Sequence, residues 1–278
     1  MPEDANLQAA LRRIAVSELT AAIGRLPADG KAPPAHVHDV RKRIKKLRGL
    51  LRLLEPGFRP FRAENAALRD AGQALASLRD STVRLATFDS LFPEVPEPLA
   101  PLRATLERQA AEAAHAPAST GAARATLAAI RTRAETWRLD GKDTAILAKG
   151  LARTRRRALA AQAEAEADPT FEALHEWRKQ AKHVWYQARL LAPVWPEVMA
   201  PVATSASTLT EDLGLHHDYA TLLVHAGPED ADGLLAARAH AAQRAIEPHV
   251  FAQGHRLLAG DPAAIADLWV AWWRLWRG

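Results

Sequence analysis

The chain of 278 residues carries 37 Lys and Arg against 32 Asp and Glu, and 48% of its residues are hydrophobic. This composition supplies a buried core and excludes a disordered chain, while the absence of cysteine excludes disulfides, thiolate metal sites and a cysteine nucleophile. The N-terminal MPEDANLQAALRR lacks an apolar signal region and no apolar run reaches membrane-spanning length, so we expect a cytoplasmic protein without a membrane span.

Pro and Gly divide the chain into helical segments, because both residues disfavour helix interiors. The breaks fall, in chain order, at 27–34, 55–60, 92–101, 115–121, 139–143, 167–170, 192–196, 226–233 and 260–262. The segments between them repeat apolar residues at helical spacing and show no strand-like alternation. We therefore predict an all-α protein of roughly ten helices.

The segment 38–54, HDVRKRIKKLRGLLRLL, predicts a helix with one basic and one apolar face. The basic face would carry His38, Arg41, Lys45, Arg48 and Arg52, flanked by Lys42 and Lys46. The opposite stripe would consist of Val40, Ile44, Leu47, Leu51 and Leu54. A solvated charged face normally mixes acids with bases, because like charges one turn apart repel, and this one does not.

Two further basic segments follow. In 149–157, KGLARTRRR, the side chains of Lys149, Arg153, Arg156 and Arg157 fall near one face, with Arg13 as a weaker counterpart in the first helix. In 175–191, HEWRKQAKHVWYQARLL, one face would present His175, Arg178, Lys182 and Arg189, with Lys179, His183 and Tyr186 on its flank and Trp177, Val184 and Leu191 opposite.

The segments 38–54 and 175–191 form an internal repeat. They match at seven positions without a gap, and 75–85 resembles 213–223 at nearly the same offset. A weaker match relates 11–19 to 151–159. We predict a single domain, 1–278, built of two helical-bundle halves at about 1–140 and 141–278, related by duplication with approximate two-fold symmetry and enclosing a basic central groove or channel.

The positive charge is local. Residues 36–52 and 175–191 together carry a net charge of +9, whereas the other 26 basic and 30 acidic residues give −4. Two facing rows of Arg, Lys and His at regular spacing suit an extended ligand with repeating negative charge. Nucleic acid is the alternative ligand that such a basic groove permits.

The C-terminal segment 268–276, LWVAWWRLW, places four Trp at helical spacing. An interfacial membrane anchor would need more than one accompanying basic residue. We therefore expect a helix that docks on the core or on a second copy of the chain.

The His-led basic helices HDVRKRIKKLR and HEWRKQAKHVWY resemble the two copies that mark the CHAD family, the conserved histidine α-helical domain. The second copy departs from the family pattern, with His183 for a Lys and Trp185 for an Arg. LTEDLGLHHD (209–218) resembles a further family segment with a Leu-Gly-x-x-x-Asp pattern, and LASLRD (75–80) its first-half counterpart. The resemblance implies two helical bundles around a basic channel, binding of inorganic polyphosphate, and association with polyphosphate granules in bacteria.

By the matched positions, the resemblance places His38, Arg41, Lys42, Lys45, His175, Arg178, Lys179 and Lys182 along the anion path, with Asp80 and Asp218 orienting the cations. His217 is a further candidate contact. We expect no catalytic residue, no cofactor and no resident metal, because His is scattered and acidic clusters are absent from the sequence. Divalent cations would accompany the polyanion as counterions. A polyphosphate-processing enzyme is the third alternative, and the oligomeric state is open.

Overall fold

The computed structural model of the chain describes residues 4–28, 32–75, 77–115, 120–227, 230 and 233–278, with the side chains of 77–80, 114 and 115 outside the description. Eleven α-helices form in these residues, and no strand does, which confirms the all-α prediction. The helices are α1 (Leu7–Gly24), α2 (Pro34–Leu54), α3 (Phe61–Gln73), α4 (Ser77–Leu91), α5 (Ala100–His115), α6 (Gly121–Ala134), α7 (Asp143–Ala167), α8 (Phe171–Leu191), α9 (Pro196–Ala226), α10 (Leu234–Leu258) and α11 (Pro262–Arg277).

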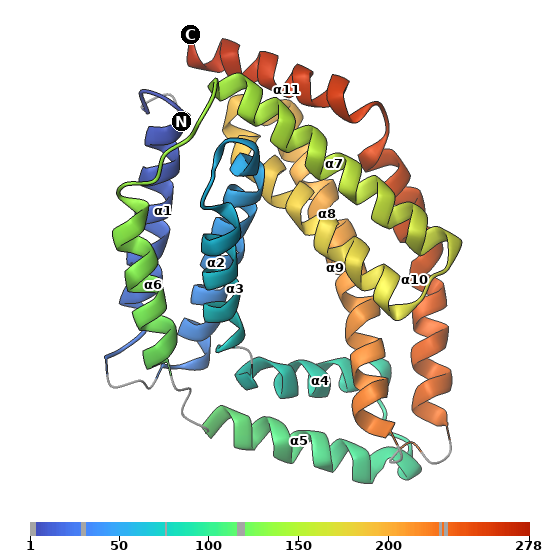
Figure 1. Ribbon diagram of the computed structural model, residues 1–278. Helices are drawn as coiled ribbons and strands as arrows, with labels where there is room; N and C mark the ends of the chain where they lie inside the picture. Colours follow the sequence, from blue (N-terminus) through green and yellow to red (C-terminus); the bar gives the residue numbers. More distant parts are fainter. Residues whose placement is uncertain (1–3, 29–31, 76, 116–119, 228–229, 231–232) are drawn as a thin grey trace.

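Three short 3₁₀-helices, Glu55–Gly57, Glu97–Leu99 and Ala192–Val194, lie at Pro-containing breaks that the sequence predicts. One break was not predicted. The chain between 61 and 91 contains no proline, yet α3 ends at Gln73 and α4 begins at Ser77. The separation lets α4 leave the direction of α3 and run across the lower part of the molecule, above α5 (Figure 1).

Helix α2 lies at the centre of the fold, between α1 and α3 on one side and α7 and α8 on the other (Figure 1). Its predicted apolar stripe is buried: Val40, Ile44, Leu47, Leu51 and Leu54 are each at most 2% exposed. These residues join the largest apolar cluster, which also takes side chains from α1, α3, α6, α7 and α11. Burial of this stripe leaves the basic face of α2 turned away from the core.

A second apolar cluster joins α4, α5, α9 and α10, and a third joins α7, α8, α9 and α10. Helix α8 contributes Trp177, which is fully buried and stacks on Phe251 of α10 with ring centroids 5.3 Å apart. Val184 and Leu191 are also buried, as the sequence predicts. Among the described residues, no helix combines the length and the apolar character of a membrane-spanning segment.

Two close approaches of backbone fix how the central helices meet. A Cβ atom on Gly49 of α2 would lie 2.6 Å from Cβ of Tyr186 on α8. A Cβ atom on Gly150 of α7 would lie 1.8 Å from the carbonyl oxygen of Leu53 on α2. Only glycine permits contacts this short, so these positions hold α2 against α7 and α8.

Candidate functional site

A cavity of about 250 Å³ lies where α2, α4, α8 and α9 meet. We call it the cationic cavity. Its lining residues are Arg41, Lys45, Val83, Arg84, Arg178, Lys182, His217, Asp218 and Thr221. Five of these side chains are cations and one is a carboxylate, so the lining carries a formal charge of +4.

The two basic helices place their predicted cations in this cavity. Arg41 and Lys45 project from α2 on the face opposite its buried stripe, and Arg178 and Lys182 do the same from α8. A hydrogen bond from Nη1 of Arg41 to the carbonyl oxygen of Gly72, 2.6 Å long, ties that guanidinium to the end of α3. The structure thus brings together cations that lie 137 residues apart in the sequence.

Helix α9 supplies the surface on which Arg178 lies. A Cβ atom on Gly214 would come within 3.1 Å of Nη2 and 3.3 Å of Nε of Arg178. The missing side chain at Gly214 therefore makes room for the guanidinium. Asp218, one turn further along α9, is the carboxylate of the cavity. Asp80, predicted to have the same orienting role, lies outside the residues whose side chains are described.

A pair of histidines borders the cavity. Nδ1 of His175 and Nδ1 of His217 are 3.1 Å apart, so one ring donates a hydrogen bond to the other. The ring of Phe171 stacks on His217 with centroids 5.0 Å apart and planes at 13°. The side chain of Thr170 accepts a hydrogen bond from the Ala173 amide, and this N-cap fixes Phe171 as the first residue of α8.

Both histidines have lowered pKa values. Burial, the neighbouring His175 and the cations Arg178 and Lys182 lower the pKa of His217 to about 4. Burial together with Lys179 and Arg178 lowers the pKa of His175. Both imidazoles are therefore neutral at pH 7, because a further positive charge among these cations is unfavourable.

Further along α2 the basic face continues into a second group of cations, which we call the Glu55 cluster. Its members are Arg48, Arg52, Glu55, Arg153, Arg157 and His183. The Glu55 carboxylate forms ion pairs with Arg52 at 3.1 Å, Arg153 at 3.1 Å and Arg157 at 3.4 Å. One carboxylate is thus shared by three guanidinium groups. Nε of Arg48 donates a hydrogen bond to Oδ1 of Asn65 on α3, 3.0 Å away.

Burial dominates the chemistry of the Glu55 cluster. Burial and the nearby Arg52, Arg48 and Arg157 lower the pKa of His183 to about 3. Burial also lowers the pKa of Arg48 and of Arg52. Within the described part of the chain, Nε of Arg52, Nδ1 of His183 and, in the cationic cavity, Nε of Arg84 are buried without a hydrogen-bond partner. Buried polar atoms without a partner are rare, and these three lie where an anionic ligand could supply the missing acceptor.

Four predicted contacts lie elsewhere. Arg13, Lys46, Tyr186 and Arg189 line a separate cavity of about 270 Å³ between α1, α2 and α8. Tyr186, which packs on Gly49 of α2, lies between Lys182 and Arg189 in α8, and these two residues line different cavities, so the row predicted from His175 to Arg189 does not stay on one surface.

The cations of this separate cavity are already engaged. Arg13 pairs with Asp4 at 2.8 Å, Lys46 pairs with Glu18, and the Arg189 guanidinium lies over the Trp185 ring, 5.0 Å from its centroid. The structure thus places these residues in a different cavity from Arg178.

Several other predicted residues line neither cavity: His38, Lys42, Lys149 and Lys179. Lys42, Lys149 and Lys179 are exposed, and Lys179 pairs with Glu176 of its own helix. His38 is partly buried on α2, one turn before Arg41. Burial raises the pKa of Tyr186 to about 12, so its hydroxyl stays protonated.

Sequence reasoning missed several residues of the site, among them Arg84 and Phe171. Arg84 comes from α4, whose position across the end of α2 depends on the unpredicted break before Ser77. Phe171 lies in the first turn of α8, where an aromatic residue has no distinguishing sequence signal. The only hint of Arg84 was its place in the segment 75–85 that resembles 213–223.

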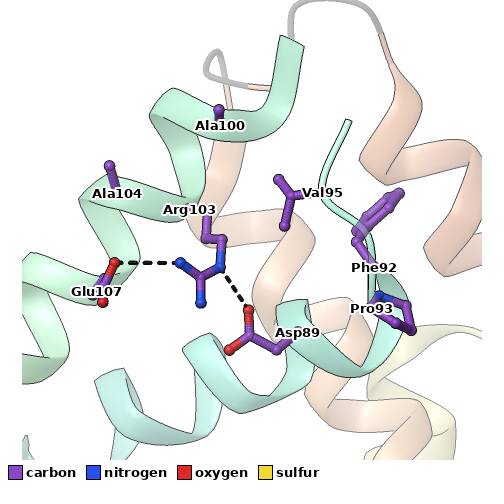
Figure 2. A pocket seen from close by; sticks show the side chains of 8 residues that line it. All are labelled: Asp89, Phe92, Pro93, Val95, Ala100, Arg103, Ala104 and Glu107. Carbon is purple, nitrogen blue, oxygen red and sulfur yellow. Dashed lines mark hydrogen bonds and ion pairs between the residues drawn. The ribbon is translucent and has the colours of Figure 1, made fainter. Parts of the chain in front are cut away.

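A larger cavity, of about 470 Å³, lies between α4 and α5 (Figure 2). Its one cation, Arg103, bridges Asp89 at 2.9 Å and Glu107 at 3.3 Å, and Phe92, Pro93 and Val95 form an apolar wall. With two carboxylates for one guanidinium, this lining is net negative and unsuited to a polyanion.

Comparison with known proteins gives one family and one fold. The sequence model of the CHAD domain matches residues 6–226. A solved structure described as the CHAD domain from the plant Ricinus communis aligns over 96% of this chain and 92% of its own, with a TM-score of 0.55 and 18% sequence identity. At this identity the likeness concerns the fold. No curated protein matches the chain.

Proposed function

The chain belongs to the CHAD domain family, and from this premise we propose that it binds inorganic polyphosphate, with the cationic cavity as the binding site. One observation carries the proposal: among the described residues, side chains from four helices bring five cations and a single carboxylate to the lining of one cavity. Arg contributes bidentate contacts to phosphate oxygens and Lys a mobile charge, so the set suits a chain of repeated phosphates. The buried Nε of Arg84 adds a donor for which the described residues provide no acceptor.

The polymer would continue from the cavity toward the Glu55 cluster. Arg48 and Arg52 follow Arg41 and Lys45 at seven-residue steps, which return to nearly the same face of a helix. The Glu55 carboxylate is shared by three guanidinium groups, so this end of the path also keeps excess positive charge. We propose one basic groove that joins the two groups.

The duplication of the chain is part of the same proposal. Helices α2 and α8, which carry the matched His-led segments, each span 21 residues, and each is followed directly by a three-residue 3₁₀-helix. We propose that two related halves contribute one basic helix each to the groove. We further propose that the protein binds without turnover and acts in the cytoplasm, at polyphosphate granules.

Nucleic acid is the second candidate ligand. The ring of Phe171 is 36% exposed and stacks on His217 of the cavity lining, so a base beside a bound phosphate would find an aromatic surface. Aromatic stacking next to cations is the usual means of binding single strands without sequence preference.

The experiment that separates these ligands is a titration of the purified protein with long-chain polyphosphate, single-stranded DNA and single-stranded RNA at matched salt. We expect tight polyphosphate binding, and displacement of bound RNA or DNA by polyphosphate far more easily than the reverse. The double variant Arg41→Ala/Arg178→Ala should lose at least about tenfold in affinity, because it removes two charge-assisted phosphate contacts.

The Arg41 substitution also removes a donor from the Gly72 carbonyl, so Lys45→Gln/Lys182→Gln provides a second test that spares this hydrogen bond. Arg108→Ala/Arg256→Ala removes the same charge from exposed positions on α5 and α10 and serves as the matched control. Equal or stronger binding of RNA or DNA would assign the cavity to nucleic acid. Phosphate release in the presence of a divalent metal would replace the binding proposal by an enzymatic one.

A further inference from the structure

The last helix, α11, has an apolar outer face as well as a buried inner one. On the inner side, Ala266, Trp269, Val270 and Trp273 are buried in the main core, where α11 packs along α7. This confirms the expectation of a docked helix. On the outer side, Leu275 is 82% exposed and Leu268 is 44% exposed.

The exposed apolar residues form a stripe. Ala264, Leu268, Ala271 and Leu275 are all exposed and follow each other at steps of four, three and four residues, the spacing of a helix–helix seam. Trp195, 43% exposed, extends the patch on one side through an edge-to-face contact with Trp272, with ring centroids 5.1 Å apart. Neighbouring exposed apolar side chains of this size are typical of an interaction surface.

The other side of the stripe carries two opposite charges. Asp267 and Arg274 are exposed and seven residues apart, so they lie two turns apart on the same flank. Neither takes part in an ion pair or a side-chain hydrogen bond within the described residues. The opposite flank, at Trp272, is aromatic.

We propose that α11 pairs with α11 of a second copy of this chain, antiparallel, about a two-fold axis near Ala271. When two copies of one helix pack antiparallel, the same flank of each copy faces the other. Asp267 of each copy would then face Arg274 of the other, giving two equivalent ion pairs. A parallel arrangement would instead set these charges against the aromatic flank.

The size of the seam predicts the strength of the dimer. A helix of 16 residues is about 24 Å long, so a single helix pair buries less surface than a standard protein interface. Ala264 and Ala271 are small and allow the two helices to approach closely around the leucines. We therefore expect a dimer that dissociates on dilution.

This proposal does not rest on the proposed function. Helix α11 runs along the upper edge of the molecule, whereas α4, which contributes to the cationic cavity, lies in the lower part, just above α5 (Figure 1). A lipid surface is a less suitable occupant, because interfacial helices carry an excess of Lys and Arg. This outer face carries one acid and one base.

The test is sedimentation of the purified 278-residue protein over a wide range of concentration, with three charge variants. Asp267→Arg alone and Arg274→Asp alone should each weaken the dimer by about tenfold, because each places like charges opposite one another twice. The combined variant Asp267→Arg/Arg274→Asp should return to within about threefold of the unmodified protein, since the antiparallel pairs re-form with reversed sign.

Leu275→Lys should abolish the dimer, and Val224→Lys, at an 80% exposed position on α9, is the matched control. A monomer at every concentration would overturn the proposal. So would a dimer that the single charge variants leave unchanged, or a combined variant as weak as the two single variants. Binding to phosphatidylcholine–phosphatidylglycerol vesicles that Leu275→Lys abolishes, without a dimer, would assign the face to lipid instead.

Discussion

The contact between His175 and His217 couples ligand binding at the cationic cavity to protonation of the two imidazole rings. The two Nδ1 atoms are 3.1 Å apart, so one proton can be shared between the rings, whereas two protons would bring two N–H groups against each other. Burial and the surrounding cations lower the pKa of His217 to about 4 and lower that of His175. A bound polyanion would reverse that electrostatic effect and raise both pKa values.

Polyphosphate affinity should therefore rise as the pH falls from 7 to 5. Because the bound state has the higher pKa, it takes up a proton in this range, and the logarithm of the association constant should change by up to about one per pH unit. Titrations at constant ionic strength would measure this slope. His217→Asn should flatten the slope, whereas His255→Gln, at an exposed histidine that pairs with Glu166 on the surface, should keep it. Equal slopes in His217→Asn and the unmodified protein would contradict the assignment.

Gly214 provides a second test at the scale of single residues. Alanine there would press on the end of the Arg178 side chain, 3.1 Å away, which is flexible and can move. We expect Gly214→Ala to weaken polyphosphate binding by about threefold to tenfold, because the guanidinium leaves its place, while the melting temperature stays nearly unchanged. An unchanged affinity, measured by the same titration, would show that the position of Arg178 on α9 does not matter.

At the scale of helices, the packing of α2 on α7 requires glycine at 150. A Cβ atom there would overlap the Leu53 carbonyl at 1.8 Å, and backbone cannot move aside as a side chain tip can. Gly150→Ala should lower the free energy of unfolding by about 3 kcal/mol or more, a large overpacking penalty. Urea unfolding would measure this loss. Gly24→Ala on α1 is the control, since nothing lies within 4 Å of its Cβ position, and an equal loss there would refute the steric explanation.

The buried and exposed faces of single helices could be predicted from the sequence, but the positions at which two helices pack against each other could not. The stripes of Val40, Ile44 and Leu47 on α2 and of Trp177 and Val184 on α8 are buried as predicted, because burial follows the helical period. The same periodicity placed Arg189 beside Lys182. A helical wheel cannot show that α8 meets α2 at Tyr186, which separates the two residues.

Part of the cationic cavity could be predicted from the sequence and part could not. Arg41 and Arg178 were predicted to meet because their segments repeat, and the structure places both in one lining. Arg84 could not be assigned, since its helix reaches the cavity only through the break after α3. Whether the repeat reflects two equivalent halves stays a prediction.

At the scale of the whole molecule, the salt dependence of binding reports how much of the basic face the polymer uses. Each phosphate neutralised by a cation releases counterions, with a slope of about −0.7 per contact for single-stranded polyanions. The five cations of the cavity alone should give a slope of roughly −3 to −4, and contacts with the Glu55 cluster should make it steeper. Titrations over a range of potassium chloride concentrations would measure the slope.

Arg48→Gln/Arg52→Gln distinguishes the two cases. If the polymer reaches the Glu55 cluster, this variant should make the slope shallower by roughly one to two. An unchanged slope would confine the ligand to the cationic cavity. The control Arg108→Ala/Arg256→Ala, at exposed positions on α5 and α10, should leave the slope as it is.

The separation of charge within the chain has a kinetic consequence. The two basic segments carry +9 and the rest of the sequence carries −4, so an approaching polyanion is attracted at the basic face and repelled over much of the remaining surface. Such a field guides diffusion before contact and speeds productive encounters. The orientation in which a polyanion arrives is then selected during approach, and the association rate, more than the dissociation rate, should respond to acidic residues far from the cavity.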